Sequence, residues 1–112
     1  MARKNPTRYH LVLSTCPTLP AAKKLASALV KERLAACANI LPIAQSVYRW
    51  KGKVHSAREF LLIIKIRAAN YTRLEARIRA LHPYELPEIV SVGIARGLKP
   101  YLQWIDNPDR IP

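Results

Sequence analysis

The sequence has few acidic residues, few glycines, two cysteines and no long apolar segment. Seven Asp and Glu stand against nineteen Lys and Arg among its 112 residues. No run of about 18 uncharged apolar residues occurs, which predicts that no segment spans a membrane. Residues 1–8 are basic and lack the apolar stretch of a secretory signal, so we expect none there. With three glycines and 50% hydrophobic residues, the chain can build its own core as a single domain over residues 1–112.

The scarcity of cysteine leaves little scope for disulfides. Cys16 and Cys37 flank a segment with helical periodicity. A helix rises ~1.5 Å per residue, so a helix of that length would hold the two thiols well apart. We therefore expect two free thiols and a reducing, cytoplasmic setting.

The charge is strongly one-sided. A net charge of +12 predicts attraction to polyanions. The cations are scattered along the chain, however, and no block of five like charges occurs. We therefore favour a solvated basic surface over a dedicated nucleic-acid interface.

The first half of the chain alternates between extended and helical patterns. Residues 9–15 are short and largely apolar, which indicates a buried strand that ends before Pro17. Apolar residues then recur at helical spacing as far as Cys37. This spacing predicts a helix that is capped by Thr18 and ends near Ala36.

The middle of the chain predicts a hairpin. Residues 38–50 are extended, and Pro42 predicts a bend because proline is confined to the edges and bulges of sheets. A glycine within 51–53 predicts the turn, and 54–58 leads back with polar residues. The segment 59–66 is almost unbroken apolar sequence, which is typical of a central strand covered on both faces.

The last third predicts a helix, a strand and a shorter helix. Asn70 can cap the second helix, and His82-Pro83 ends it because a residue before proline avoids helical geometry. Residues 89–94 read as a fourth strand. Residues 99–106 predict the short final helix, and the tail at 107–112, like residues 1–8, is expected to be less ordered.

The resulting βαββαβ order predicts an α+β, ferredoxin-like split βαβ sandwich with a long hairpin between its second and third strands. Right-handed crossovers would place both helices on one face of the sheet. The central strand is apolar on both of its faces, with Phe60, Leu62, Ile64 and Ile66 on one and Leu61 and Ile63 on the other. One face must therefore be covered from outside the chain, which predicts an oligomer.

Several motifs occur in order along nearly the whole sequence. They are LVKERLAACANILP at 29–42, SVYRWKGK at 46–53, Glu59 with Ile64-Lys65, HPYELPEI at 82–89 and YLQWI at 101–105. Together these residues closely resemble the CutA family of divalent-cation tolerance proteins. The resemblance implies a ferredoxin-like homotrimer in which long hairpins pair between subunits, similar to PII-type signalling proteins that bind ligands in clefts between subunits. It implies tolerance of divalent metals, copper above all, with no required cofactor and no agreed enzymatic reaction.

Two residues depart from the copper-binding members of that family. Those members resemble one another in a cysteine at the end of the first strand and paired histidines before the Pro-Tyr dipeptide. The corresponding positions here are Ser14 and Leu81, and only His82 is kept. Cys16 lies two residues beyond Ser14 and could partly replace the missing cysteine. The resemblance therefore implies binding of Cu²⁺ with Cys16 and His82 as the remaining ligands.

Candidate metal ligands gather around the second proline-rich turn. His82, Glu85 and Glu88 recur at every third residue, and their nitrogen and carboxylates suit Zn²⁺ or Cu²⁺. Cys16 lies near a predicted helix start, which favours thiolate character and makes it the better soft-metal ligand of the two cysteines. The alternative, which we favour, is that His82 and Glu88 bond the backbone and fix the turn.

Four further residues are candidates for a cleft between subunits. Cys37 is expected to be a buried core residue rather than a nucleophile. Glu59 and Lys65 share one side of a strand, so Lys65 either pairs with Glu59 or Glu88 or binds an anion in the cleft. Tyr84 is the fourth. The aromatic residues predicted to anchor the oligomer interface are Tyr48, Trp50, Tyr101 and Trp104.

These observations favour a trimeric protein of metal response that binds a divalent cation or small ligand at subunit clefts. A non-catalytic scaffold or a PII-like signalling protein is the alternative. An RNA-binding module shares the topology, but residues 60–64 lack the aromatic pair needed to stack bases. No nucleophile–base–orienter set occurs, so the sequence supports no enzyme class.

Overall fold

The computed structural model describes residues 7–110; residues 1–6 and 111–112, parts of the two segments expected to be less ordered, lie outside the described residues. The elements along the chain are β1 (Tyr9–Cys16), α1 (Leu19–Lys31), β2 (Cys37–Trp50), β3 (Lys53–Arg67), the 3-10 turn η1 (Ala68–Asn70), α2 (Tyr71–Leu81), β4 (Val90–Gly93) and α3 (Lys99–Asp106). The final helix has the bounds that the sequence predicts.

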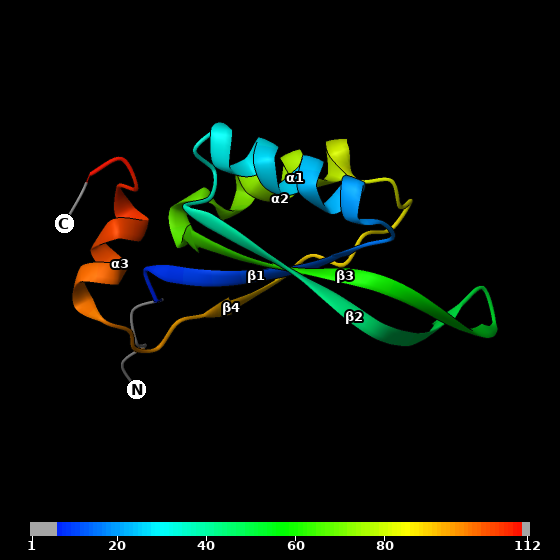
Figure 1. Cartoon of the computed structure of the whole chain (residues 1–112). Coiled ribbons are helices and arrows are strands. Elements are labelled where there is room, and N and C mark those ends of the chain that lie inside the picture. Colours follow the sequence, from blue (N-terminus) through cyan, green and yellow to red (C-terminus); the bar gives the residue numbers. More distant parts are fainter. Residues whose placement is uncertain (1–6, 111–112) are drawn as a thin grey trace.

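The four strands form one sheet in the order β2-β3-β1-β4, and every neighbouring pair is antiparallel. Helices α1 and α2 lie on one face of this sheet, and α3 lies at its end (Figure 1). The mixed α+β architecture and the order of elements expected from the sequence are thus confirmed. Within residues 7–110, no helix combines the length and the apolarity that a membrane crossing requires.

Helix α1 starts as predicted and ends five residues early. The Thr18 hydroxyl accepts a hydrogen bond from the Ala21 amide at 3.2 Å, which caps the first turn. At the other end the Arg33 amide bonds the Val30 carbonyl and the Leu34 amide bonds the Leu29 carbonyl, at 3.1 and 3.0 Å. With Arg33 at φ +61°, this is a Schellman motif, in which the left-handed position usually belongs to glycine.

Two expectations about this region are therefore wrong. The helix ends at Lys31 rather than near Ala36, and Cys37 begins β2 instead of closing the helix. Leu34 is nevertheless buried, because the Schellman turn folds the chain back onto the core. The apolar spacing thus continues to Leu34, although the helical backbone ends at Lys31. Cys37 itself is half-buried rather than a core residue.

Strand β3 begins earlier than predicted. The segment 54–58, expected to be a polar lead-in, is already part of β3, which starts at Lys53. Lys51 and Gly52 have φ values of +49° and +78°, as a type I′ turn requires at both of its central residues. The register shifts between Ile43 and Ser46, so the predicted bend is a bulge that follows Pro42 directly.

The two faces of the sheet differ in cover. Leu62, Ile64 and Ile66 of β3 are fully buried beneath α1 and α2. Strand register places a second apolar set on the opposite side, and we call it the open face; it consists of Leu11, Leu13, Leu41, Leu61, Ile63, Val90 and Val92. Val90 and Val92 are exposed, as is Leu41. Both faces of β3 are thus apolar as predicted, and the described chain covers one of them.

One core position holds an unsatisfied hydroxyl. Ser14 is fully buried beside Leu62, and its Oγ has no hydrogen-bond partner among the described residues. A buried hydroxyl without a partner loses its hydration and gains nothing in return. We predict that Ser14→Ala leaves the free energy of unfolding unchanged or raises it by up to ~1 kcal/mol, as measured by chemical denaturation.

The matched control for that variant is Ser91→Ala. Ser91 lies on the surface, and its Oγ is 2.6 Å from His10 Nδ1. The same substitution here removes a made hydrogen bond, so we expect a loss of about 0.5 kcal/mol or more. A larger loss at Ser14 than at Ser91 would show that the buried hydroxyl is bonded after all.

Candidate functional site

Five residues meet at the end of the sheet where β1 finishes, and we call them the Cys16–His82 cluster: Thr15, Cys16, Glu59, His82 and Tyr84. The two β1 residues arrive there because β1 pairs with β3 up to the contact of Cys16 with Phe60. His82 is placed by the end of α2, where it is the C-terminal cap before Pro83. Topology thus joins residues that are 66 positions apart in the sequence.

Both ring nitrogens of His82 have partners. The Tyr84 amide donates to His82 Nδ1 at 3.0 Å, and His82 Nε2 lies 2.7 Å from the Thr15 carbonyl oxygen. A carbonyl can only accept, so these partners assign the proton to Nε2. His82 therefore ties the turn after α2 to the end of β1. This is the structural role that the sequence reasoning favoured for His82.

The Cys16 thiol lies in a setting that disfavours its anion. Burial, and then the negative charge of Glu59, raise the pKa of Cys16 to about 11. At neutral pH roughly one thiol in ten thousand would be ionised. The expected thiolate character at this position is therefore wrong. The Nε2 proton of His82 is directed to Thr15, and the sulfur is 3.7 Å from that nitrogen, so His82 is not placed as a base for Cys16.

Glu59 is held by a tyrosine rather than by a lysine. Its Oε2 accepts a hydrogen bond of 2.7 Å from the Tyr84 hydroxyl, and the residue is buried. Burial, the hydrogen bond to Glu59 and the charge of that carboxylate raise the pKa of Tyr84 well above its ordinary value. The pair closes the cluster toward the open face, because Glu59 shares that side of β3 with Leu61.

Lys65 and Cys37 lie at the other end of the sheet. They are paired with each other across β2 and β3, and Lys65 faces Leu11 of β1. Leu11 is five residues from Cys16, or roughly 16 Å along a strand. Lys65 Nζ donates to the Asn39 side-chain carbonyl, so the predicted ion pair with Glu59 or Glu88 is absent from the described residues. Both cysteines are free, as expected.

The structure brings together only part of the predicted metal set. Cys16 and His82 are neighbours, whereas Glu85 and Glu88 are exposed outside the cluster. Within residues 7–110, no group of three His, Cys, Asp or Glu is arranged to hold a metal ion. Ser14 and Leu81, the two departures from the copper-binding pattern, face the core: Ser14 is buried, and Leu81 packs against the buried cluster.

Cys16 and His82 alone do not make a complete metal site. Their 3.7 Å separation suits two donors on one cation, since Zn–S and Zn–N bonds are about 2.3 and 2.0 Å. A cation on Nε2 would, however, move the ring proton to Nδ1, where it would face the Tyr84 amide. The thiol must also lose a tightly held proton. Coordination at this pair therefore requires the turn after α2 to rearrange and further donors to be supplied.

The predicted interface aromatics lie on two elements, β2 and α3. Tyr48 stacks on His55 across the hairpin, with ring centroids 5.6 Å apart. Trp50 lies beside the Lys51 ammonium, which is 5.8 Å from the ring centroid. The rings of Tyr101 and Trp104 lie side by side on α3, with their centroids 5.5 Å apart. Their role in an interface stays a prediction.

Sequence reasoning missed two parts of the cluster. The Thr15 carbonyl is a backbone atom, and no side-chain pattern indicates it. The bond from Tyr84 to Glu59 crosses 25 residues, and only the even spacing of Glu59 within an apolar strand hinted that this acid needs a partner.

The protonation of Cys16 gives a direct test of the cluster. In a Cys37→Ser variant, with Cys16 as the only thiol, we expect the ¹³Cβ resonance of Cys16 to titrate with a midpoint near pH 11 because burial opposes the anion. Glu59→Gln removes the neighbouring charge while keeping an acceptor for Tyr84, and we expect it to lower the midpoint. A midpoint near the ordinary value of about 8.5 would contradict the buried setting.

The same shift fixes the sign of a pH effect on stability. The folded pKa of Cys16 lies above the unfolded one, so the stabilisation by the protonated thiol is complete below about pH 8.5 and is lost as the pH rises toward 11. Denaturation measured between these limits should show less alkaline loss in Cys16→Ala than in the parent chain.

Comparisons with known proteins agree with this architecture. A sequence profile described as "CutA1 divalent ion tolerance protein" matches residues 10–108. The "Divalent-cation tolerance protein CutA" of Thermus thermophilus is 47% identical over 95 residues, which cover 85% of this chain and 92% of that protein. The chloroplastic CutA of Arabidopsis thaliana is 45% identical over 100 residues, covering 89% of this chain but 55% of that protein. The chain thus spans little more than half the length of some of the relatives that it matches.

Solved structures are similar over nearly the whole fold. A crystal structure of CutA from Xylella fastidiosa superposes with a TM-score of 0.86 at 46% identity, covering 89% of this chain and 96% of that one. The protein named "Periplasmic divalent cation tolerance protein CutA" from Archaeoglobus fulgidus has a TM-score of 0.85 at 39% identity, covering 88% and 95%. The chain therefore belongs to the CutA1 family of divalent ion tolerance proteins.

Proposed function

We propose that this protein works as a ferredoxin-like homotrimer of the CutA type that serves tolerance of divalent cations without catalysing a reaction. The observation that carries the proposal is the open face, whose seven apolar residues are exposed or only half-buried within the described chain. An exposed apolar surface of this kind marks an interaction site. Packing three identical sheets about an axis would bury it.

The hairpin supports the same assembly. Beyond the bulge at 43–46, its strands extend past the helices and expose Val47 and Val54 (Figure 1). The outer strands β2 and β4 also leave unpaired backbone edges, which readily pair with another chain. Contact with neighbouring subunits at the hairpin would cover both features.

The trimer can be tested with a pair of leucine variants. Leu41 on the open face and Leu19 on α1 are 41% and 38% exposed, so an aspartate can be accommodated at either position in a single subunit. We expect Leu41→Asp to convert a trimer into monomers, because it places a charge in the interface, while Leu19→Asp remains trimeric. Native mass spectrometry and sedimentation read the outcome. A monomeric parent chain, or a trimeric Leu41→Asp, would contradict the proposal.

Cation binding is proposed at the Cys16–His82 pair. The pair offers one sulfur and one nitrogen 3.7 Å apart, and a neighbouring subunit would supply the remaining donors. Soft cations such as copper prefer these donor types. Binding must displace the thiol proton, so it is expected to be weak at neutral pH.

We predict that Cu²⁺ affinity, measured by calorimetry, rises up to about tenfold per pH unit between pH 6 and 8 because a proton leaves the thiol. Cys16→Ser and His82→Gln should each weaken binding about tenfold or more. His10→Gln is the control, since His10 contacts Ser91 at a distant strand edge. Equal binding by the two cluster variants and the control would exclude this pair as the site.

The engagement of both His82 nitrogens favours a second candidate function. A trimer in which His82 is purely structural would be a scaffold or a PII-like signalling protein that responds to a small ligand in its clefts. Absence of Cu²⁺ and Zn²⁺ binding at micromolar concentration would select it. In either case we propose a cytoplasmic location, supported by two free cysteines at opposite ends of the sheet.

A further inference from the structure

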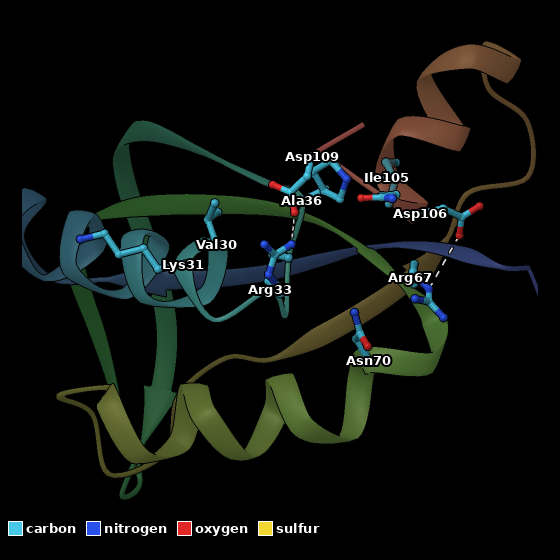
Figure 2. Close-up of a pocket in the computed structure, with 12 residues that line it drawn as sticks. Val30, Lys31, Arg33, Ala36, Arg67, Asn70, Ile105, Asp106 and Asp109 are labelled. Atoms are coloured by element: carbon cyan, nitrogen blue, oxygen red, sulfur yellow. Dashed lines mark hydrogen bonds and ion pairs between the residues drawn. The ribbon is translucent and has the colours of Figure 1, made fainter. Parts of the chain in front are cut away.

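A separate pocket lies within one subunit, at the end of the sheet opposite the Cys16–His82 cluster. It has a volume of about 390 Å³ and is enclosed by the turn after α1, the end of β3 and the residues that follow α3 (Figure 2). Its apolar walls include Val30, Ala35, Ile105 and Pro108. The Schellman turn forms one rim, because it reverses the chain between Lys31 and Ala36.

Two guanidinium groups and one amide supply the hydrogen-bond donors of the pocket. Arg33 and Arg67 line it, whereas the ammonium of Lys31 points away from them in Figure 2. Asn70, whose side chain points toward the same space in Figure 2, is 9% exposed. Its Oδ1 accepts from Arg73 at 2.6 Å, and among the described residues no acceptor bonds its Nδ2. This nitrogen keeps contact with solvent, since Ser14 Oγ is the one fully buried side-chain polar atom without a partner among the described residues, and it is therefore free to donate to a bound group.

One of the two acids in the pocket is already satisfied. Asp106 accepts from the Tyr9 hydroxyl at 2.6 Å and from Arg8 Nε at 3.1 Å, while Arg67 Nε is 3.7 Å away. Burial alone would raise the pKa of Asp106, but these hydrogen bonds and the charges of Arg8 and Arg67 together lower it. Asp106 is thus an ionised, fully bonded wall group, and Arg67 is its most distant partner.

The second acid, Asp109, occupies the position that a bound anion would take. Asp109 follows α3 and pairs with the guanidinium of Arg33 across the pocket (Figure 2). Both side chains are more than half exposed, at 62% and 73%, and an ion pair that is so well solvated contributes little stability. A carboxylate in the turn after α3, held by a solvated ion pair, therefore lies where another anion could replace it.

We propose that this pocket binds a small organic anion, whose charged group is held by Arg33, Arg67 and Asn70 in place of Asp109 and whose compact apolar body lies against Val30 and Ile105. Arginine suits this role, because its planar donors match carboxylate and phosphate oxygens two at a time. The volume lies near the lower limit for small-molecule sites, so the body must be short. All the residues that line the site belong to one subunit, and the proposal involves no cation.

Two sources share this chemistry, a carboxylic acid and a phosphate monoester. We would titrate the full chain with butyrate, monobutyl phosphate and inorganic phosphate, and follow the methyl resonances of Val30 and Ile105 by NMR. We expect saturable shifts at both residues and none at Val47 or Val54 of the distant hairpin. Saturation by butyrate alone assigns a carboxylate head, by monobutyl phosphate alone a phosphate head, and by inorganic phosphate alone excludes a role for the apolar wall.

Three variants separate a built site from general attraction by a basic protein. Arg67→Gln should weaken binding about tenfold or more, because it removes a two-pronged donor. Asp109→Asn should strengthen binding about threefold or more, because it removes the internal competitor. Arg79→Gln deletes the same charge from the exposed side of α2 and should change nothing. No saturable shift with any probe, an equal loss in Arg79→Gln, or unchanged affinity in Asp109→Asn would overturn the proposal.

Discussion

The alternation of side chains along β3 is the constraint on which the rest of the molecule depends. Successive residues of a strand point to opposite faces, and in β3 both faces are apolar. Two helices can cover only one face of a four-stranded sheet, and α1 and α2 do so completely over Leu62, Ile64 and Ile66. The order of the layers and the open face on the uncovered side of the sheet both follow from this strand.

Much of the fold could be predicted because the elements carry strong local signals. Thr18 caps its helix, a glycine marks the hairpin turn, and the apolar run at 59–66 lies in the centre of the sheet. The end of α1 could not be predicted. Arg33 adopts the left-handed conformation that usually belongs to glycine, so the sequence carries no glycine to mark the end of the helix. Leu34 continues the apolar spacing, but it is buried from a non-helical turn.

The candidate site was harder to predict than the fold, because closeness in sequence is a poor guide to closeness in space around a turn. His82, Glu85 and Glu88 are evenly spaced, but only His82 points inward. Its true partners come from the distant end of β1, and one of them is a backbone carbonyl. Lys65 likewise bonds an asparagine on the next strand instead of an acid on its own. Such pairings depend on strand register, which composition does not encode.

The bulge between Ile43 and Ser46 has a consequence for the hairpin that carries Tyr48 and Trp50. Before it, odd-numbered residues of β2 share the side of Leu41; beyond it, the register places even-numbered residues there. The extra residue thus inverts the parity of the strand and aims both aromatic rings to the same side as Leu41. Loss or gain of one residue at this point would exchange them with Val47 and Arg49 on that side, with no change in the residues of the hairpin tip itself. The length of this short segment, more than its chemistry, determines what the tip of the hairpin presents to its surroundings.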